Sequence, residues 1–486
     1  MKTSITTLVY MAALQTLVVA SEKPNIIYIL ADDLGYGDLG CYGQKIIKTP
    51  HIDKMAAEGM RFTQHYAGST VCAPSRSCLL EGKHSGHTYI RGNGPIQMRE
   101  DPHEKIFPRA LQQVGYHTAM IGKSGVGCNT DDASLTYKKG FDYFFGFTSH
   151  GKAHMYFPEY LWRNDHGEVS QIEYPNNTLH EGNYYSSELV IQEALSYIEK
   201  HREGPFFLHL ALQIPHASLC AKEEWKDKYR PILKEELLPP KDKKRGYSYE
   251  REPKTTFAAM VSYMDHNMGL LFAKLKDLGI SENTLVMFSS DNGAMQEGGH
   301  QRESFNSSSI LRGGKRDMWE GGIRTPMIAW WPGKIKAASE TDHISAFWDI
   351  SSTVRELAGA ESQPDTDGIS MVPTLFNQDT QRKHEYLYWE YYGGTGKRAI
   401  RKGDWKLIKY DTNINLEPRT ELFNLAKDIS EQNNLVQQYP EMVSELRKLM
   451  EQAHEPAESD RFKLAAELSP EERAKLSSSK KKKKKS

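Results

Sequence analysis

The chain has 486 residues, of which 38% are hydrophobic and 26% charged, a composition that supports a large core and argues against a fibrous or wholly disordered protein. Its 62 Lys and Arg residues nearly balance 63 Asp and Glu residues, so the formal net charge is −1. Six of the lysines form the run 480–485, which leaves the rest of the chain slightly acidic. This balance gives no electrostatic basis for a dedicated nucleic-acid-binding protein.

The first 20 residues are typical of a secretory signal peptide. Lys2 precedes the apolar run 8–20, which is too short to span a bilayer and ends in small residues before a polar stretch. A buried N-terminal helix is the alternative interpretation. Because no later run reaches membrane-spanning length, we expect an exported protein, periplasmic or secreted, without a membrane span.

Short runs that are apolar throughout recur along the chain, at residues 25–31, 116–121, 206–214 and 284–289. Continuous apolarity, without alternation, predicts strands that are covered on both faces, as in a parallel sheet. Amphipathic helical patterns lie between these runs, for example at 187–200 and 256–278. The order of elements therefore predicts an α/β fold with a large, mixed, mostly parallel sheet between layers of helices.

The texture of the sequence changes after about residue 365. Short strands with glycine-containing turns are predicted at 386–389, 399–400 and 405–408, and an amphipathic helix at 439–453. We expect a catalytic domain at 21–365, a smaller α+β subdomain at 366–455, and a disordered polar tail at 456–486.

Polar residues follow the apolar runs directly, where the carboxyl ends of parallel strands would gather them at a ligand-binding edge. Among them, Asp32, Asp33, Asp291 and Asn292 offer only oxygen ligands, a set that suits a hard cation and favours Ca²⁺ over Mg²⁺. An ordinary turn or helix cap is the alternative for an Asp-Asp pair.

The segment 71–76 combines a cysteine with signals for the start of a helix. Pro74 and Ser75 suit the first helical turn, which would leave Cys72 beside an anion-binding helix N-terminus, with Arg76 adding positive charge. A buried structural cysteine, or one bonded to Cys78, is the alternative.

The string Cys72-Ala73-Pro74-Ser75-Arg76, followed by Leu80-Glu81-Gly82, resembles the signature of the type I sulfatases of the alkaline phosphatase-like superfamily. In that family the cysteine is oxidised after translation to formylglycine. The resemblance extends from residue 24 to about residue 435, and its other motifs occur in family order at 31–35, 215–216, 291–293, 312–316, 320–326 and 421–425.

The resemblance implies roles for individual residues. Asp32, Asp33, Asp291 and Asn292 would hold Ca²⁺ beside the aldehyde made from Cys72, whose hydrated form would attack sulfur. Arg76 would favour the alkoxide. Lys123, Lys315 and His216 would hold sulfate oxygens, and either Lys315 or His216 would protonate the leaving alcohol.

The chain departs from the family pattern at one position. Many relatives have a histidine where this chain has Gly125, and that histidine is the one usually credited with taking a proton from the diol. The segment 153–164 resembles a segment of carbohydrate sulfatases that carry the glycine form. We therefore expect His150 or His154 to replace the base or to bind sugar, with Arg163 as a further substrate-binding candidate. Otherwise both histidines belong to a surface loop.

The sequence thus predicts a sulfatase acting on a sulfated glycan, with a galactose-type sugar as the expected unit. Its other partner would be the machinery that generates formylglycine. Two alternatives stay open at this point: a phosphatase or phosphonate hydrolase of the same superfamily, and a non-catalytic protein that binds sulfated glycans.

Overall fold

The structure, a computed structural model, describes residues 23–94, 98–99, 106–126, 134–178, 181–239, 247 and 249–475. The expected signal peptide and the lysine run 480–485 lie outside these residues. Within the described part of the chain, we find no helix that combines the length and apolarity needed to cross a membrane.

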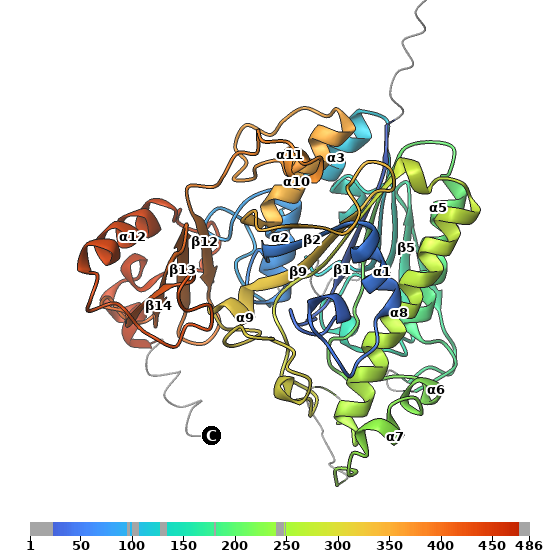
Figure 1. The fold of residues 1–486 in the computed structure, drawn as a ribbon, viewed down its shortest axis with the longest axis horizontal. Coiled ribbons are helices and arrows are strands. Elements are labelled where there is room, and N and C mark those ends of the chain that lie inside the picture. Colours follow the sequence, from blue (N-terminus) through green and yellow to red (C-terminus); the bar gives the residue numbers. More distant parts are fainter. Residues whose placement is uncertain are drawn as a thin grey trace, which may run out of the picture.

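The main sheet has eleven strands and lies at the centre of the larger unit (Figure 1). Its order is β10 (Ser339–Thr341), β2 (Met60–Tyr66), β9 (Arg324–Trp330), β8 (Thr284–Ser290), β1 (Asn25–Ala31), β7 (Phe206–Ala211), β3 (His117–Lys123), β4 (Tyr143–Phe147), β5 (Tyr160–Asp165) and β6 (Glu168–Glu173), with β11 (Ser345–Ala346) paired to β2. The central strands β8, β1, β7, β3 and β4 run parallel, whereas β9, β5 and β6 are antiparallel to their neighbours. The sheet is therefore mixed and mostly parallel, as the sequence predicts.

The four predicted strands are confirmed as β1, β3, β7 and β8. Every residue of β1, β7 and β8 is buried, and β3 exposes only its first residue. Such strands are apolar throughout because helices cover both faces of the sheet.

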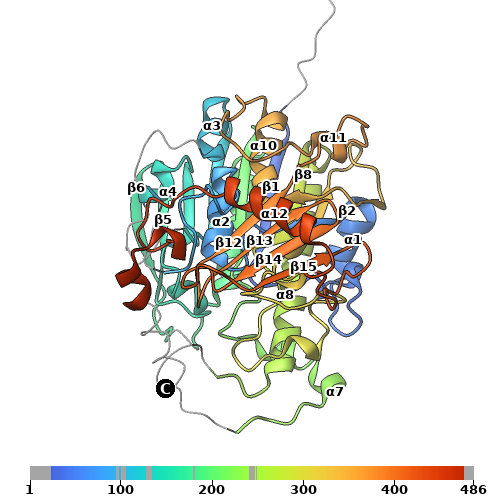
Figure 2. The same cartoon turned by 90° about the vertical axis from the view of Figure 1, so that its left-hand side faces the viewer.

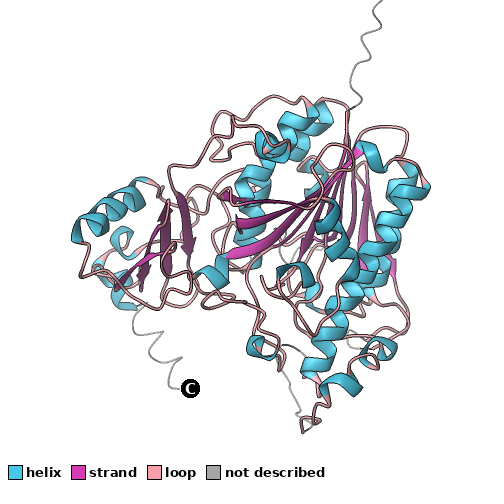
Figure 3. Cartoon of the chain, in the orientation of Figure 1, coloured by secondary structure: helices cyan, strands magenta, loops and turns pink. Residues whose placement is uncertain are grey.

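Helices form a layer on each side of the sheet (Figures 1 and 3). One core unites the sheet with α1 (Pro50–Glu58), α5 (Ser186–Lys200) and α8 (Pro253–Asp277), which include the two predicted helices. The other core unites it with α2 (Cys72–Glu81), α3 (Phe107–Gln113) and α10 (Phe347–Ala358). Apart from α12 and η5, which are described below, the remaining helices of the described residues are short: α4 (Ser134–Lys138), α6 (Glu223–Lys226), α7 (Arg230–Leu233), α9 (Glu320–Ile323), α11 (Val372–Leu375), η1 (Gly40–Tyr42), η2 (Lys152–His154), η3 (Ser281–Asn283) and η4 (Arg302–Ser304).

A smaller antiparallel sheet follows, built from β12 (Leu387–Tyr391), β13 (Lys397–Lys402), β14 (Trp405–Tyr410) and β15 (Thr420–Asn424) (Figure 2). Its side chains alternate between two cores. Tyr388 and Leu407 pack under α12 (Pro440–Gln452), whereas Trp389 and Ile408 pack toward the larger unit against Trp348. The strands β12, β13 and β14 and the helix α12 match the predicted elements, whereas β15 was not predicted as a strand.

The segment 456–475 differs from the expected disordered tail. It contains η5 (Ala465–Glu467), and both Phe462 and Leu464 are buried. Phe462 packs on Tyr392, and the Ala465 backbone N–H donates a hydrogen bond to the carbonyl of Thr412. A few apolar residues in a polar stretch are thus enough to dock it on the smaller unit.

Candidate active site

The predicted metal ligands lie together at the carboxyl ends of β1 and β8. Ala31 pairs with Ser290 in the register of these strands, so the residues that follow them are neighbours. The backbone N–H of Asp33 donates to Asp291 Oδ1 at 3.1 Å, and Asn292 Nδ2 donates to Asp33 Oδ1 at 2.8 Å. Asp32, Asp33, Asp291 and Asn292 are all fully buried.

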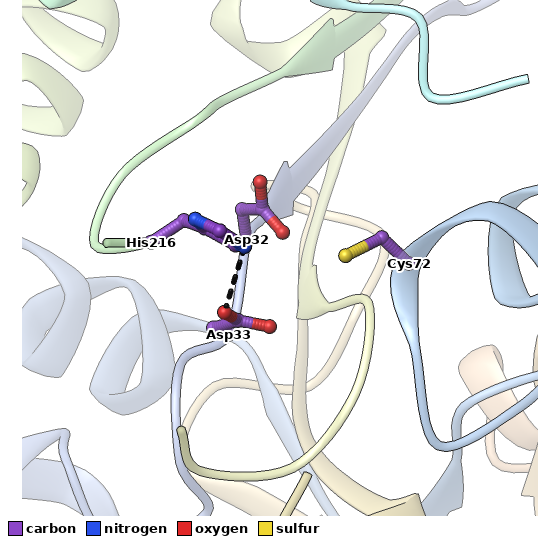
Figure 4. Close-up of side chains that lie close together, drawn as sticks. All are labelled: Asp32, Asp33, Cys72 and His216. Carbon is purple, nitrogen blue, oxygen red and sulfur yellow. Dashed lines mark ion pairs between the residues drawn. The ribbon is translucent and has the colours of Figure 1, made fainter. Parts of the chain in front are cut away.

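Cys72 lies opposite these carboxylates, at the first position of α2 (Figure 4). One ligand atom from each of Asp32, Asp33, Cys72 and His216 lies within 4.8 Å of the others. Burial raises the pKa of the Cys72 thiol well above its usual value. An unmodified Cys72 would therefore be a neutral thiol and a poor nucleophile.

Two buried cations contact the aspartates. Lys123, the last residue of β3, donates through Nζ to Asp32 Oδ2 at 2.5 Å. Arg76, one turn along α2 from Cys72, places Nη2 2.9 Å from Asp291 Oδ2 and donates through Nη1 to the carbonyl of Lys123 at 2.8 Å. The predicted anion-binding helix start therefore forms one network with three strand ends, those of β1, β3 and β8.

Lys315 uses all three donors of its ammonium group. Its Nζ donates to Asp33 Oδ2 at 2.7 Å, to His216 Nε2 at 3.1 Å and to Glu297 Oε2 at 3.1 Å. Burial disfavours the charged form, yet the adjacent Asp33 carboxylate holds the pKa of Lys315 well above its ordinary value. Lys315 is therefore a buried cation with a fixed position.

His216 follows the end of β7, and its backbone carbonyl accepts a hydrogen bond from the Tyr156 hydroxyl at 2.8 Å. Its Nδ1 bonds to the carbonyl of Ala217, which can only accept, so Nδ1 carries the proton. Its Nε2 is then free to accept from Lys315. Burial and the charge of Lys315 hold the pKa of His216 well below its usual value, so the imidazole is neutral.

The donor set fits a hard divalent cation. Asp32 Oδ1 and Asn292 Oδ1 are buried and lack a hydrogen-bond partner among the described residues. Burial, and after it the Asp32 carboxylate, raise the pKa of Asp291, which shows that negative charge is crowded here. Orphaned oxygens and crowded carboxylates are features that an oxygen-liganded cation would relieve.

His150 and His154 lie beside this cluster. The His154 ring stacks on the His216 ring, with centroids 4.0 Å apart and planes 6° apart, and His150 packs edge-on against His154. His150 Nδ1 and His154 Nε2 are buried without a hydrogen-bond partner in the described structure. Burial lowers the pKa of both rings, that of His150 to about 3.

Gly125 is held in a conformation that leaves no space for a side chain. Its φ is +70°, and a Cβ atom there would lie 2.3 Å from Cδ of Arg76. The loop after β3 therefore passes directly over the arginine of the site, and a histidine at this position would require the loop or Arg76 to move.

The contacts that the structure describes for Arg163 are not with this cluster, and its role as a substrate-binding residue stays a prediction. Its Nε donates to the Tyr143 hydroxyl at 2.9 Å, and Nη2 lies 3.3 Å from Glu193 Oε2. Arg163 sits within β5 and bridges to α5, because its side chain points out of the face of the sheet that α5 covers and not beyond the strand end.

Two residues that the sequence interpretation missed also belong to the site. Glu297 contacts Lys315, as described above, and the Tyr247 ring packs edge-on against both His154 and His216, with centroids 5.4 Å away in each case. Neither residue stands in a motif. Glu297 follows Asp291-Asn292 by only a few residues, but nothing in that loop distinguishes it from a solvated glutamate.

The family model described as Sulfatase matches residues 24–360, and a model described as N-sulphoglucosamine sulphohydrolase, C-terminal, matches residues 313–456. Among named relatives, N-acetylgalactosamine-6-sulfatase of Canis lupus familiaris is 31% identical over 80% of this chain and 72% of its own length. N-acetylgalactosamine-6-O-sulfatase of Bacteroides thetaiotaomicron is 27% identical over 89% of this chain and 93% of its own.

Solved structures agree with the family assignment. A Bacteroides thetaiotaomicron sulfatase from a study of glycosaminoglycan metabolism superposes with a TM-score of 0.72, at 26% identity over 89% of this chain and 99% of its own. A phosphonate monoester hydrolase of Agrobacterium radiobacter shares the fold, with a TM-score of 0.61 at 19% identity over 88% of this chain and 96% of its own. The fold alone therefore does not choose between sulfur and phosphorus. The extended family match does, and the chain belongs to the sulfatase family of sulfuric ester hydrolases.

Proposed function

We propose that the protein is an exported, Ca²⁺-dependent sulfatase that removes sulfate from a sulfated carbohydrate, with a galactose-type sugar as the unit attacked. The observation that carries this proposal is the position of Cys72, at a helix start opposite Asp32 and Asp33 and among three buried cations. The relatives named for N-acetylgalactosamine support the choice of sugar.

We propose that Cys72 is converted to formylglycine by a separate maturation machinery. One hydroxyl of the hydrated aldehyde attacks sulfur, and loss of a proton from the other expels sulfate and restores the aldehyde. The buried thiol supports this proposal, because its raised pKa makes cysteine itself unsuited to attack.

Asp32, Asp33, Asp291 and Asn292 would hold Ca²⁺, together with an oxygen at position 72. When bound, the ion supplies positive charge that favours the ionised form of the nucleophile. Lys123 and Arg76 hold the surrounding carboxylates in place and offer donors to sulfate oxygens.

We assign protonation of the leaving alcohol to Lys315. We favour Lys315 over His216, because the only ring proton of His216 is directed at a backbone carbonyl, whereas one of the three Lys315 N–H groups can turn from Asp33, His216 or Glu297 to the substrate oxygen. His216 then acts by holding Lys315 and by accepting its hydrogen bond.

We propose that His150 and His154 take over the proton transfer that many relatives assign to a histidine at the position of Gly125. Their buried, unpartnered ring nitrogens and their stacking beside His216 support this role, since both rings are neutral and lie near the site. If His150→Ala and His154→Ala both keep normal turnover, the proposal fails.

The proposed function is tested by supplying the protein from a host that makes formylglycine with N-acetylgalactosamine 6-sulfate, other sulfated galactose-type oligosaccharides and matched phosphate esters. We expect release of inorganic sulfate. Retention of the oligosaccharides without sulfate release would identify a non-catalytic binding protein, and preferential release of phosphate would identify a phosphatase.

A further inference from the structure

The Glu297 carboxylate lies within the site although the proposed chemistry assigns it no step. Its side chain is only 10% exposed. Oε2 accepts from Lys315 Nζ at 3.1 Å, and Oε1 accepts from Arg316 Nη2. Arg316 is about half exposed, whereas Lys315 is buried. Glu297 therefore places a fixed negative charge between the interior of the site and its solvent side.

The other buried charges of the site cancel in number. Asp32, Asp33 and Asp291 supply three carboxylates, and Arg76, Lys123 and Lys315 supply three cations, all buried. With the proposed Ca²⁺ bound the site is net positive, so the Glu297 carboxylate limits how strongly the site attracts a second negative charge on the substrate. An anion held by Lys315 would also be close to Glu297, since both contact the same Nζ atom.

We propose that Glu297 sets the preference of the site for a singly charged sulfate ester over a doubly charged phosphate ester. This inference rests on the proposed function. Sulfate and phosphate esters have the same tetrahedral shape, but a phosphate monoester carries between about −1.5 and −2 charges at neutral pH. Each further negative charge on the substrate is repelled by the Glu297 carboxylate, in a buried setting where solvent screens it poorly.

The contacts of Glu297 also allow a simpler role, in which it only holds the Lys315 ammonium group in place. The two roles have different consequences. If Glu297 only positions Lys315, a change at Glu297 should weaken the binding of the sulfate and the phosphate ligand by the same factor. If Glu297 discriminates by charge, the ratio of the two affinities should change.

The test measures the dissociation constants of benzenesulfonate, a singly charged stand-in for a sulfate ester, and phenylphosphonate, a stand-in for a phosphate ester that carries close to two charges at pH 8, from the concentration dependence of thermal unfolding. These probes report on the site whether or not the protein turns over an ester. For Glu297→Gln we expect the preference for benzenesulfonate over phenylphosphonate to fall about tenfold or more, because the neutral amide keeps the shape and removes the charge. Glu297→Asp retains the charge and should keep the wild-type ratio.

Glu303→Gln is the matched control, since Glu303 lies in the same loop region, is mostly exposed and pairs only with Arg302 among the described contacts. It should leave the ratio unchanged. Should Glu297→Gln fail to fold, Arg316→Gln tests the inference with the opposite sign: it leaves Glu297 less neutralised and should weaken phenylphosphonate binding relative to benzenesulfonate.

An unchanged ratio in Glu297→Gln, or an equal change in Glu303→Gln, would overturn the inference. If Glu297→Gln does not fold, an Arg316→Gln variant with the wild-type ratio would overturn the inference instead. The kcat/KM ratio for a sulfate ester and its phosphate counterpart should follow the binding ratio. A wild-type protein that hydrolyses no sulfate ester in its mature form would instead contradict the proposed function. The ratio of the two anion affinities would still test the role of Glu297.

Discussion

At the scale of single residues, Gly125 is a position where this chain cannot carry a side chain without a rearrangement. A positive φ and a contact with Arg76 together exclude a side chain there. The two neutral histidines that lie near the site come from a different loop, after β4. Under the proposed function, His150 and His154 supply the base from this second loop because the chain passes too close to Arg76 for a side chain at Gly125.

Gly125→Ala should disturb the arginine as well as the backbone. We expect a loss of about 1–3 kcal/mol from backbone strain, a further cost from the overlap with Arg76, and at least about a tenfold loss in turnover. Gly115→Ala is the control, because Gly115 also has a positive φ of +88° but has nothing near its Cβ position. Thermal unfolding and kcat/KM measure both variants, and equal effects would show that the Arg76 contact has no importance.

Lys315→Ala should slow the reaction according to the leaving group. For a sugar alcohol, which needs a proton to depart, we expect kcat to fall by about 10²–10⁴. For 4-nitrophenyl sulfate, whose leaving group is stable as an anion, the fall should be much smaller. Equal losses for both substrates would remove Lys315 from the role of acid and return it to His216.

The sequence located most residues of the site because they follow apolar strands and stand in motifs. Asp32 and Lys123 are strand-end residues, and the structure joins them at 2.5 Å. Arg163 was predicted from the resemblance of its segment alone, and in the structure its side chain bonds to Tyr143 of the neighbouring strand. Glu297 was missed because its contact with Lys315 depends on the fold of two loops, which no local pattern encodes.

At the scale of elements, burial on both faces made β1, β7 and β8 predictable. β2 was missed because its exposure is irregular, and β6 because it is an exposed edge strand. The order and register of the strands could not be predicted from the sequence either. The pairing of β1 with β8 brings together Asp33 and Asn292, residues that lie 259 positions apart.

Fully buried ion pairs join the smaller sheet to the larger unit. Lys406 of β14 lies 2.9 Å from Glu320 Oε1 of α9 and 3.0 Å from Glu431 Oε1, and all three side chains are completely buried. Such a network fixes the two units in one arrangement, because a charge left alone there cannot reach water.

Lys406→Met should therefore destabilise the protein by about 3–5 kcal/mol, since it leaves the buried Glu431 carboxylate without its cation and Glu320 with Arg324 alone. Lys402→Met is the matched control, because Lys402 pairs with Glu445 at the surface and should contribute less than about 1 kcal/mol. Denaturant unfolding measures both free energies. A Lys406→Met variant as stable as Lys402→Met would show that the network does not hold the units together.

At the scale of the whole molecule, the smaller unit supports the site from one side. Lys397 of β13 donates through Nζ to the carbonyl of Arg316 at 2.8 Å and to Asp317 Oδ1 at 3.1 Å. This contact anchors the loop that carries Lys315. The sequence predicted the smaller unit from its change in texture, but the contact itself depends on how the two units pack.

Removal of the divalent cation should change stability as well as activity. We expect chelation to lower activity, and Ca²⁺ to raise the unfolding free energy by about 2.7 kcal/mol at one hundred times its dissociation constant. Asp33→Asn should lose most of this Ca²⁺-dependent stabilisation. If Ca²⁺ changes neither the thermal unfolding nor the activity of the chelated protein, the proposed metal site is wrong.

The central claim is that Cys72 is modified and supplies the nucleophile. Mass spectrometry of the peptide that contains Cys72, taken from active protein made in its native host, tests this claim most directly. The account predicts an aldehyde at position 72 in the active fraction, and loss of turnover with a retained fold in Cys72→Ala. An unmodified thiol throughout fully active protein would contradict it.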